Sequence, residues 1–132
     1  MLDQTTTGDD VTTAQRAPSA VDPSEQEGPP LLEFGLVRNG TTETLFVRGE
    51  LDISSAPSFE HAVADALDGQ GGVFRVDLGG LTFMDSTGAG SLLRVHARVE
   101  GIGRDLVLVH PTRSVRRVLE LLGLDQVIRV EH

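Results

Sequence analysis

A serine surrounded by small and acidic residues is the clearest candidate for chemistry in this sequence. Ser86 follows Asp85 directly, within the run from Gly79 to Gly90, and the apolar spacing beyond it predicts a helix that starts near Thr87. A phosphate on a hydroxyl at a helix start would meet unpaired backbone N–H groups and the positive end of the helix dipole. The small residues 88–90 would leave its approach open. Ser86 therefore fits a phosphate acceptor.

The same run also fits a purely structural role. Asp85 or Ser86 could serve as an ordinary N-cap, in which a side-chain oxygen accepts a hydrogen bond from an N–H group of the first turn. The glycines that follow would then only provide packing room. The residue types alone leave both interpretations open.

A serine hydrolase is the rival chemistry for Ser86. A nucleophile elbow has the pattern Gly-x-Ser-x-Gly, whereas Met84 occupies the first glycine position here. His96 lies ten residues further along the same predicted helix, about 15 Å of rise away, which is beyond hydrogen-bond reach. His61 and His110 could approach Ser86 only through tertiary folding. We therefore expect no enzymatic activity.

Composition excludes several other kinds of site. Cysteine is absent, which removes disulfides, thiolate metal sites and cysteine nucleophiles. All 11 basic residues are arginine, so neither a Schiff-base lysine nor the lysine of a phosphate-binding P-loop is present. A net charge of −9 argues against a nucleic-acid partner, whose binding rests on clustered positive charge. We expect no cofactor and no metal.

The charge is concentrated at the N-terminus. Residues 1–30 hold six acidic side chains against Arg16 alone, together with four of the six prolines. Such a segment cannot bury enough apolar surface to offset the entropy of ordering it. We predict a disordered acidic tail at 1–30, acting either as a solubilising tail or as a partner-binding arm, and a single domain at 31–132. No stretch reaches about 20 apolar residues and no secretory signal is visible, so we expect a soluble cytoplasmic protein without membrane contact.

The elements that position Ser86 follow from the apolar pattern. Two alternating runs on either side of Asn39–Gly40 predict an antiparallel hairpin. Ser54 or Ser55 can cap a following helix with Pro57 in its first turn, which the glycine-rich turn at 69–72 ends.

The second half of the domain repeats a strand and helix alternation. Strands are predicted at 73–78, 106–109 and 127–130, with helices between them starting near Thr87 and after Pro111. Short links of this kind make the strands parallel, and Gly79–Gly90 is interpreted as a loop joining a strand to its helix. The predicted fold class is α/β, with a mixed sheet of about five strands flanked by about three helices.

Three arginines share the polar face of the last predicted helix. Arg113, Arg116 and Arg117 lie there with Glu120, and the i,i+4 spacing of Arg116 and Glu120 predicts an ion-paired, solvated face. A patch for a partner is the alternative.

The run Leu81-Thr82-Phe83-Met84-Asp85-Ser86-Thr87-Gly88-Ala89-Gly90 resembles the phosphorylation loop of bacterial anti-sigma factor antagonists, the STAS domain family. Gly49-Glu50-Leu51-Asp52 resembles that family's loop after its second strand, and residues 123–130 resemble its closing helix and strand. The resemblance covers about residues 31–131 in the right order.

The resemblance implies a function and a set of site residues. Ser86 would accept the phosphate, beside Asp85 and facing Asp52 from the neighbouring loop, and Thr87 and Gly88 would complete the partner-binding site. The unphosphorylated form would bind an anti-sigma factor that is also an ATP-dependent serine kinase and so free a sigma factor, whereas phosphorylation would block binding. A stand-alone STAS scaffold, or a module that answers to a phosphatase without acting on a sigma factor, is the alternative.

Overall fold

The computed structural model describes residues 32–67 and 72–132, and these form one five-stranded sheet with strand order β1-β2-β3-β4-β5. The predicted tail at 1–30 lies outside the described residues, as does most of the glycine-rich turn at 69–72. Three α-helices and a short 3-10 helix accompany the sheet in this part of the chain. The predicted α/β class, with a mixed sheet of five strands and three helices, is confirmed.

The domain opens with the predicted hairpin. β1 (Leu32–Asn39) pairs antiparallel with β2 (Thr42–Leu51), and the last pair is Asn39 with Thr42. The turn is therefore Gly40–Thr41, one residue later than predicted. Gly40 has φ +64°, a conformation that glycine adopts without steric cost.

The rest of the sheet is parallel. β3 (Val73–Met84) pairs with β2 on one side and with β4 (Asp105–Val109) on the other, and β5 (Arg129–Glu131) closes the sheet beside β4. Parallel neighbours require crossover connections, which helices supply here.

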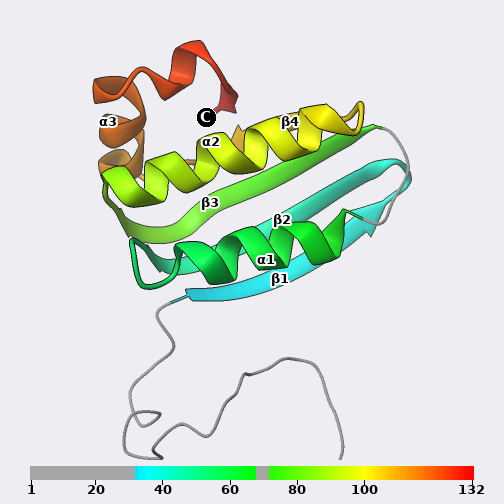
Figure 1. Ribbon diagram of the computed structural model, residues 1–132, viewed down its shortest axis with the longest axis horizontal. Coiled ribbons are helices and arrows are strands. Elements are labelled where there is room, and N and C mark those ends of the chain that lie inside the picture. The colour runs from blue at the N-terminus through cyan, green and yellow to red at the C-terminus, as the bar shows by residue number, and fades with distance from the viewer. Residues whose placement is uncertain (1–31, 68–71) are drawn as a thin grey trace, which may run out of the picture. The chain divides into compact units, whose positions relative to one another are not determined.

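Helices α1 (Ala56–Ala66) and α2 (Ser86–Gly101) lie side by side over one face of the sheet, as Figure 1 shows. α3 (Arg113–Leu121) lies at one end of that layer, and Gly123 follows it with φ +73°, as the predicted helix stop requires. A 3-10 helix, η2 (Leu124–Gln126), then leads into β5 and was not predicted.

The core lies between the sheet and the two long helices. Alternate residues of β2, β3 and β4 point to the helices, as expected for a pleated strand, and each helix buries one face. The fully buried side chains include Val47, Phe59, Val63, Phe74, Val76, Leu78, Leu92, Val95 and Leu108. This packing fixes the helix starts relative to the strand ends.

The run 79–84 is strand, which corrects the loop that we predicted from Gly79 to Gly90. β3 continues beside β2 to the pair Leu51 and Met84, with register shifts after Phe46 and after Gly49. A Cβ on Gly80 would lie 2.5 Å from the Cγ atom of Arg48, so this glycine serves a close approach between strands. Only Asp85 separates β3 from α2.

A buried ion pair holds the opposite end of β2. Arg104, just before β4, donates from Nη1 to Glu43 Oε1 at 2.8 Å, and the two side chains are 1% and 5% exposed. Arg38 of β1 also pairs with Glu43. The guanidinium carbon of Arg104 lies 5.7 Å from the centre of the Phe74 ring, within cation–π range.

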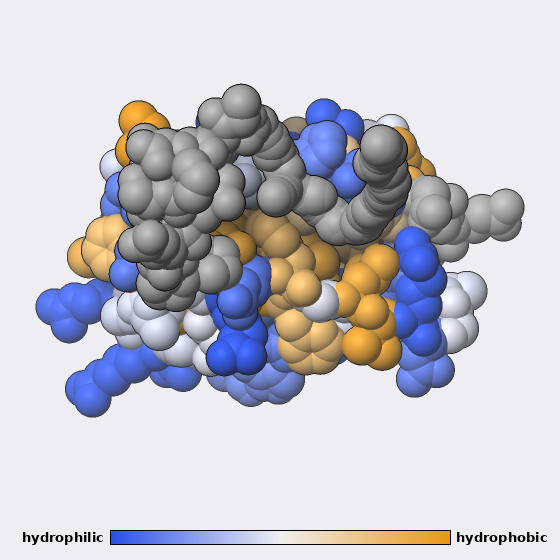
Figure 2. All heavy atoms as spheres, turned by 90° about the horizontal axis from the view of Figure 1, so that it is seen from below, coloured by the Kyte–Doolittle hydropathy of each residue, from blue (hydrophilic) through white to orange (hydrophobic). Residues whose placement is uncertain are grey.

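β1 is an edge strand with apolar side chains in contact with solvent. Phe34, Leu36 and Val37 are 37%, 38% and 55% exposed, and apolar side chains gather on the face that includes this edge in Figure 2. Charged Glu33 and Arg38 flank this run of residues, which disfavours pairing with another edge strand.

Across the described residues, no helix combines the length and the apolar character needed to cross a membrane.

Candidate functional site

Ser86 is the first residue of α2, and Asp85 is its N-cap. The Asp85 carboxylate accepts a hydrogen bond from the Gly88 N–H at 2.9 Å, and the Asp85 carbonyl accepts one from the Ala89 N–H at 2.9 Å. The capping role that we left open between Asp85 and Ser86 thus falls to Asp85. Ser86 is exposed, and its hydroxyl forms no hydrogen bond with any described residue. The hydroxyl is therefore available for chemistry from solvent.

Two of the predicted site residues, Asp52 and Asp85, lie at the carboxyl ends of adjacent strands. Leu51 and Met84 are the last paired residues of the parallel strands β2 and β3, so Asp52 and Asp85 follow in the same row. The Asp85 N–H also donates to the Leu51 carbonyl at 3.3 Å. The turn into α1 and the start of α2 lie at the same end of the molecule in Figure 1.

Asp52 shapes its own loop. Its Oδ1 accepts from the N–H groups of Ser54 at 2.9 Å and Ser55 at 3.2 Å, which is an Asx-type turn into α1. Ser55 occupies the N-cap position, but its hydroxyl donates to the Glu50 carbonyl at 2.7 Å and accepts from the Asp52 N–H at 3.0 Å, and it accepts no hydrogen bond from the first turn of the helix. The predicted capping by a serine hydroxyl is wrong because Asp52 provides the acceptor. Asp52 is half-buried and places its charge at the edge.

Gly88 provides packing room between α2 and β2. It is buried, and a Cβ at this position would lie 2.3 Å from the Leu51 carbonyl oxygen and 2.9 Å from the Met84 Cγ. Ala89 is also buried, whereas Gly90 has no atom closer than 3.6 Å to such a Cβ. Contrary to our expectation, Gly88 and Ala89 therefore serve packing and do not open an approach to Ser86. Thr87 is half-buried.

Two apolar side chains at this edge were missed in the sequence. Ile53, directly after Asp52, is 73% exposed, and Phe83, three residues before Ser86, is 47% exposed. The signal was present, because Ile53 is a large apolar residue within an otherwise polar turn. Exposed aliphatic and aromatic residues beside polar groups are typical of protein-binding surfaces.

Comparison with known proteins places this geometry in a family. The family model described as "Mlab, STAS domain" matches residues 34–130. The chain belongs to the STAS domain family. Its curated relatives include anti-sigma factor antagonists. It is 31% identical to the anti-sigma-B factor antagonist of Listeria monocytogenes over 88 residues, which is 67% of this chain and 77% of that protein. It is 33% identical to the anti-sigma F factor antagonist of Lysinibacillus sphaericus over 88 residues, or 64% and 74% of the two chains.

Solved structures of STAS proteins have the same fold. The anti-sigma factor antagonist SpoIIAA in its unphosphorylated form superposes with a TM-score of 0.60 at 26% identity, over 74% of this chain and 87% of that one. An anti-sigma factor antagonist from Mycobacterium paratuberculosis gives a TM-score of 0.64 at 21% identity, over 76% and 85% of the two chains.

The STAS domain's two long helices are joined beside the site. Arg94 of α2 donates to Glu60 of α1, with Nη2 to Oε2 at 2.8 Å. The Arg94 guanidinium holds the pKa of the Glu60 carboxyl below its usual value. This solvent-exposed ion pair links the two helices, and the Asp85–Leu51 hydrogen bond ties the start of α2 to the end of β2.

Three of the four histidines, His61, His96 and His110, pair with carboxylates and not with Ser86. His96 pairs with Glu100 at 3.2 Å, His61 with Asp65 at 3.4 Å, and His110 with Asp77 at 2.9 Å. Among the residues that the structure describes, no histidine hydrogen-bonds the Ser86 hydroxyl, and no cluster of His, Asp or Glu side chains could hold a metal ion.

Proposed function

We propose that this STAS domain is a phosphorylation-controlled anti-sigma factor antagonist. The unphosphorylated form binds an anti-sigma factor that is also a serine kinase and thereby frees a sigma factor, and phosphorylation of Ser86 blocks that binding. The observation that carries the proposal is the Ser86 hydroxyl, exposed and unbonded at an edge that also exposes Ile53 and Phe83.

The position of Ser86 explains why a phosphate would act on a partner and leave the fold intact. A phosphoserine carries about −1.5 to −2 charges at neutral pH. The N–H group of Gly88, which could have received this phosphate, already donates to the Asp85 carboxylate. Repulsion from that carboxylate directs the added charge outward, to the surface that a partner would cover.

The expected size of the effect is large enough for a switch. Asp52 and Asp85 already place negative charge at this edge. A phosphate inside the contact adds like-charge repulsion and a desolvation cost, and a penalty of roughly 3 kcal/mol weakens binding by about two orders of magnitude. No rearrangement of the sheet is required.

The proposal assigns the roles of the remaining groups. Asp52, Asp85, Ser86, Thr87 and Gly88 form or support the partner-binding edge, with Gly88 acting through packing. The ATP site belongs to the kinase partner, and the domain itself is not an enzyme. It acts in the cytoplasm by binding a protein. Residues 31–132 suffice for this role, and residues 1–30 are a dispensable acidic tail.

The direct test is phosphorylation by a candidate anti-sigma factor kinase. The full chain is incubated with the kinase and ATP, the phosphate is mapped by mass spectrometry, and binding is measured before and after. We expect a single phosphate on Ser86 and loss of the complex. Phosphate on Thr87, Ser54 or Ser55 would contradict the site, and a complex that survives phosphorylation would favour a scaffold role.

A further inference from the structure

One face of α3 carries positive charge that the fold does not use. Arg113, Arg117 and Leu121 lie one turn apart along the helix, and all three are exposed, Leu121 by 75%. The predicted ion pair between Arg116 and Glu120 does not form. In the described part of the chain, no acidic side chain pairs with Arg113, Arg116 or Arg117.

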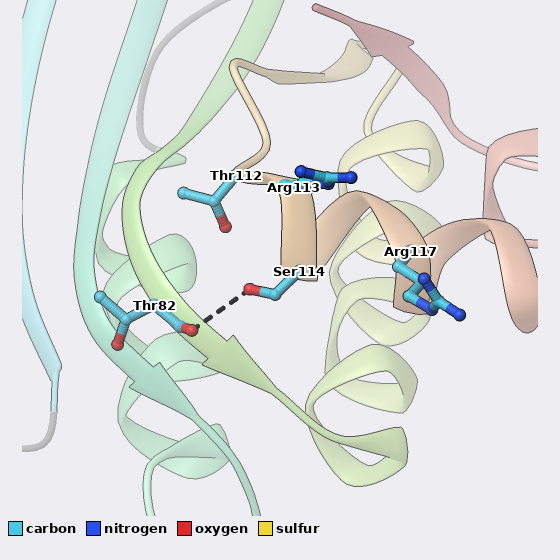
Figure 3. Close-up of a pocket in the computed structure, with 5 residues that line it drawn as sticks. All are labelled: Thr82, Thr112, Arg113, Ser114 and Arg117. Carbon is cyan, nitrogen blue, oxygen red and sulfur yellow. Dashed lines mark hydrogen bonds between the residues drawn. The ribbon is translucent and has the colours of Figure 1, made fainter.

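A hollow lies beside this face, between α3 and the end of β3. It is a shallow depression of about 560 Å³, wide open to solvent and lined by Thr82, Thr112, Arg113, Ser114 and Arg117. Figure 3 shows Ser114 turned toward β3 while Arg113 and Arg117 project from successive turns of α3. Arg113 and Arg117 are the charged residues that line the hollow, and their side chains extend from its rim toward solvent.

The hydroxyl groups of the hollow are committed to the fold. Thr112 donates to the Leu81 carbonyl at 2.8 Å, Ser114 to the Thr82 carbonyl at 3.3 Å, and Thr82 to the Gly49 carbonyl at 3.0 Å. The first two bonds fix the start of α3 against β3, and the third joins β3 to β2. A ligand of the hollow would therefore be recognised through its two arginines.

We propose that the Arg113–Arg117–Leu121 face, with the hollow beside it, docks an acidic segment of a partner protein. The segment would present two carboxylates about one helical turn apart, followed by an apolar side chain. Arginine binds carboxylates through paired, charge-assisted hydrogen bonds, and exposed Leu121 adds apolar contact that a small anion could not use.

Charge favours this occupant over the alternatives. The chain has a net charge of −9 and therefore repels an acidic segment over most of its surface. The arginine patch on α3 is a local exception, so an acidic segment of a partner would bind there. The same net charge disfavours nucleic acid. This docking surface goes beyond the proposed switch at Ser86 and does not depend on it.

The test uses a synthetic helical peptide that contains Glu-x-x-x-Glu-x-x-x-Leu. Isotope-labelled full-length protein is titrated with the peptide, and backbone amide shifts are followed by NMR. We expect the largest shifts at residues 112–121 and at Thr82. A matched peptide with glutamine in place of both glutamates should bind roughly tenfold more weakly.

Protein variants provide the second half of the test. Arg113→Gln combined with Arg117→Gln should weaken peptide binding roughly tenfold, whereas Arg116→Gln, which removes one positive charge of the same helix outside the hollow, should change binding less than about twofold. All three side chains are exposed, so the variants should fold. The inference is overturned if no shifts appear at millimolar peptide or if the shifts map elsewhere on the domain. It is also overturned if the glutamine peptide binds as tightly as the glutamate peptide, or if Arg116→Gln weakens binding as much as the double variant does. No kinase or phosphorylation enters this test, so its failure would leave the proposed function standing.

Discussion

Gly88 lies so close to the Leu51 carbonyl that a Cβ on residue 88 would approach its oxygen to 2.3 Å. With the hydrogen bond from the Asp85 N–H to the same carbonyl, this contact ties the start of α2 to the end of β2. The position of Ser86 relative to Asp52 therefore depends on main-chain packing, which substitutions can test.

Gly88→Ala should destabilise the domain. The added methyl overlaps a backbone carbonyl that cannot rotate away, and overpacking of this kind costs about 1–3 kcal/mol. Thermal or urea unfolding measures the loss. The matched control is Gly90→Ala in the same helix, where the nearest atom is Arg94 Nη1 at 3.6 Å, so stability should hold or rise by up to about 1 kcal/mol. Equal losses in the two variants would contradict the packing role of Gly88.

Ser86→Ala should leave stability within about 0.5 kcal/mol, because the exposed hydroxyl forms no hydrogen bond with the described residues. Asp85→Ala should cost about 0.5–2 kcal/mol through loss of the N-cap. Urea denaturation of both variants beside the wild type checks this order. A Ser86→Ala loss as large as that of Asp85→Ala would show that Ser86 is chiefly structural.

Partner affinity should separate Ser86→Ala from Ser86→Asp. The alanine variant should bind a nucleotide-loaded anti-sigma factor kinase as the wild type does and escape regulation. The aspartate variant should bind at least tenfold more weakly, although one carboxylate charge imitates phosphate only in part. Titration calorimetry measures both affinities. Equal affinities would argue against the switch, and a turnover activity lost in both variants would point to catalysis.

Glu43 should make the stability of the domain depend on pH. Burial alone would raise the pKa of the Glu43 carboxyl, but the hydrogen bonds and charges of Arg38 and Arg104 outweigh burial and hold this pKa below its usual 4.5. The ion pair therefore contributes fully above about pH 4.5, and its contribution is lost as the pH falls through the lowered pKa.

Glu43→Gln tests this contribution. Leaving Arg104 buried without its charge partner should cost roughly 3–5 kcal/mol at pH 7. The difference from the wild type should shrink as the pH falls below about 4.5. Exposed Glu120, which has no ion pair among the described residues, supplies the control Glu120→Gln, for which we expect little change at either pH. A difference that stays constant with pH would contradict the linkage.

Removal of residues 1–29, so that the chain starts at Pro30, should leave folding and kinase binding unchanged. The expectation rests on composition, because the segment is acidic, proline-rich and poor in apolar residues. Thermal melts and pull-downs of the shortened and full chains check it. A large drop in binding would make the segment a partner-binding arm.

The sequence predicted the element types well, because each has a local signal. Asn39–Gly40 marked the hairpin within one residue, and Gly123 marked the end of α3. The run from Gly79 to Met84 was misjudged because its two glycines look like a turn. In the folded chain they permit a close approach and a register shift within a strand, and only the pairing with β2 reveals this.

The sequence predicted which candidate residues lie near one another, but their role stays a prediction. Ser86 and Asp85 stand beside each other in a motif, and parallel pairing of β2 with β3 brings Asp52 to the same edge. The pair of Glu43 with Arg104 joins residues 61 apart in the chain, and no local pattern reports it. The Arg116–Glu120 pair is the opposite case, because a local pattern predicted an ion pair that does not form. Spacing of i,i+4 permits an ion pair without enforcing it.

The main-chain link between Leu51 and α2 has a consequence for how such domains diversify. Since the carbonyl of Leu51, the N–H of Asp85 and the bare Cα of Gly88 hold the edge together, the outward side chains Ile53 and Ser86 contribute little to holding it. Under the proposed function, substitutions at those outward positions would change partner recognition at small cost in stability. Duplicated copies of this domain could then diverge in their partners while keeping a single scaffold.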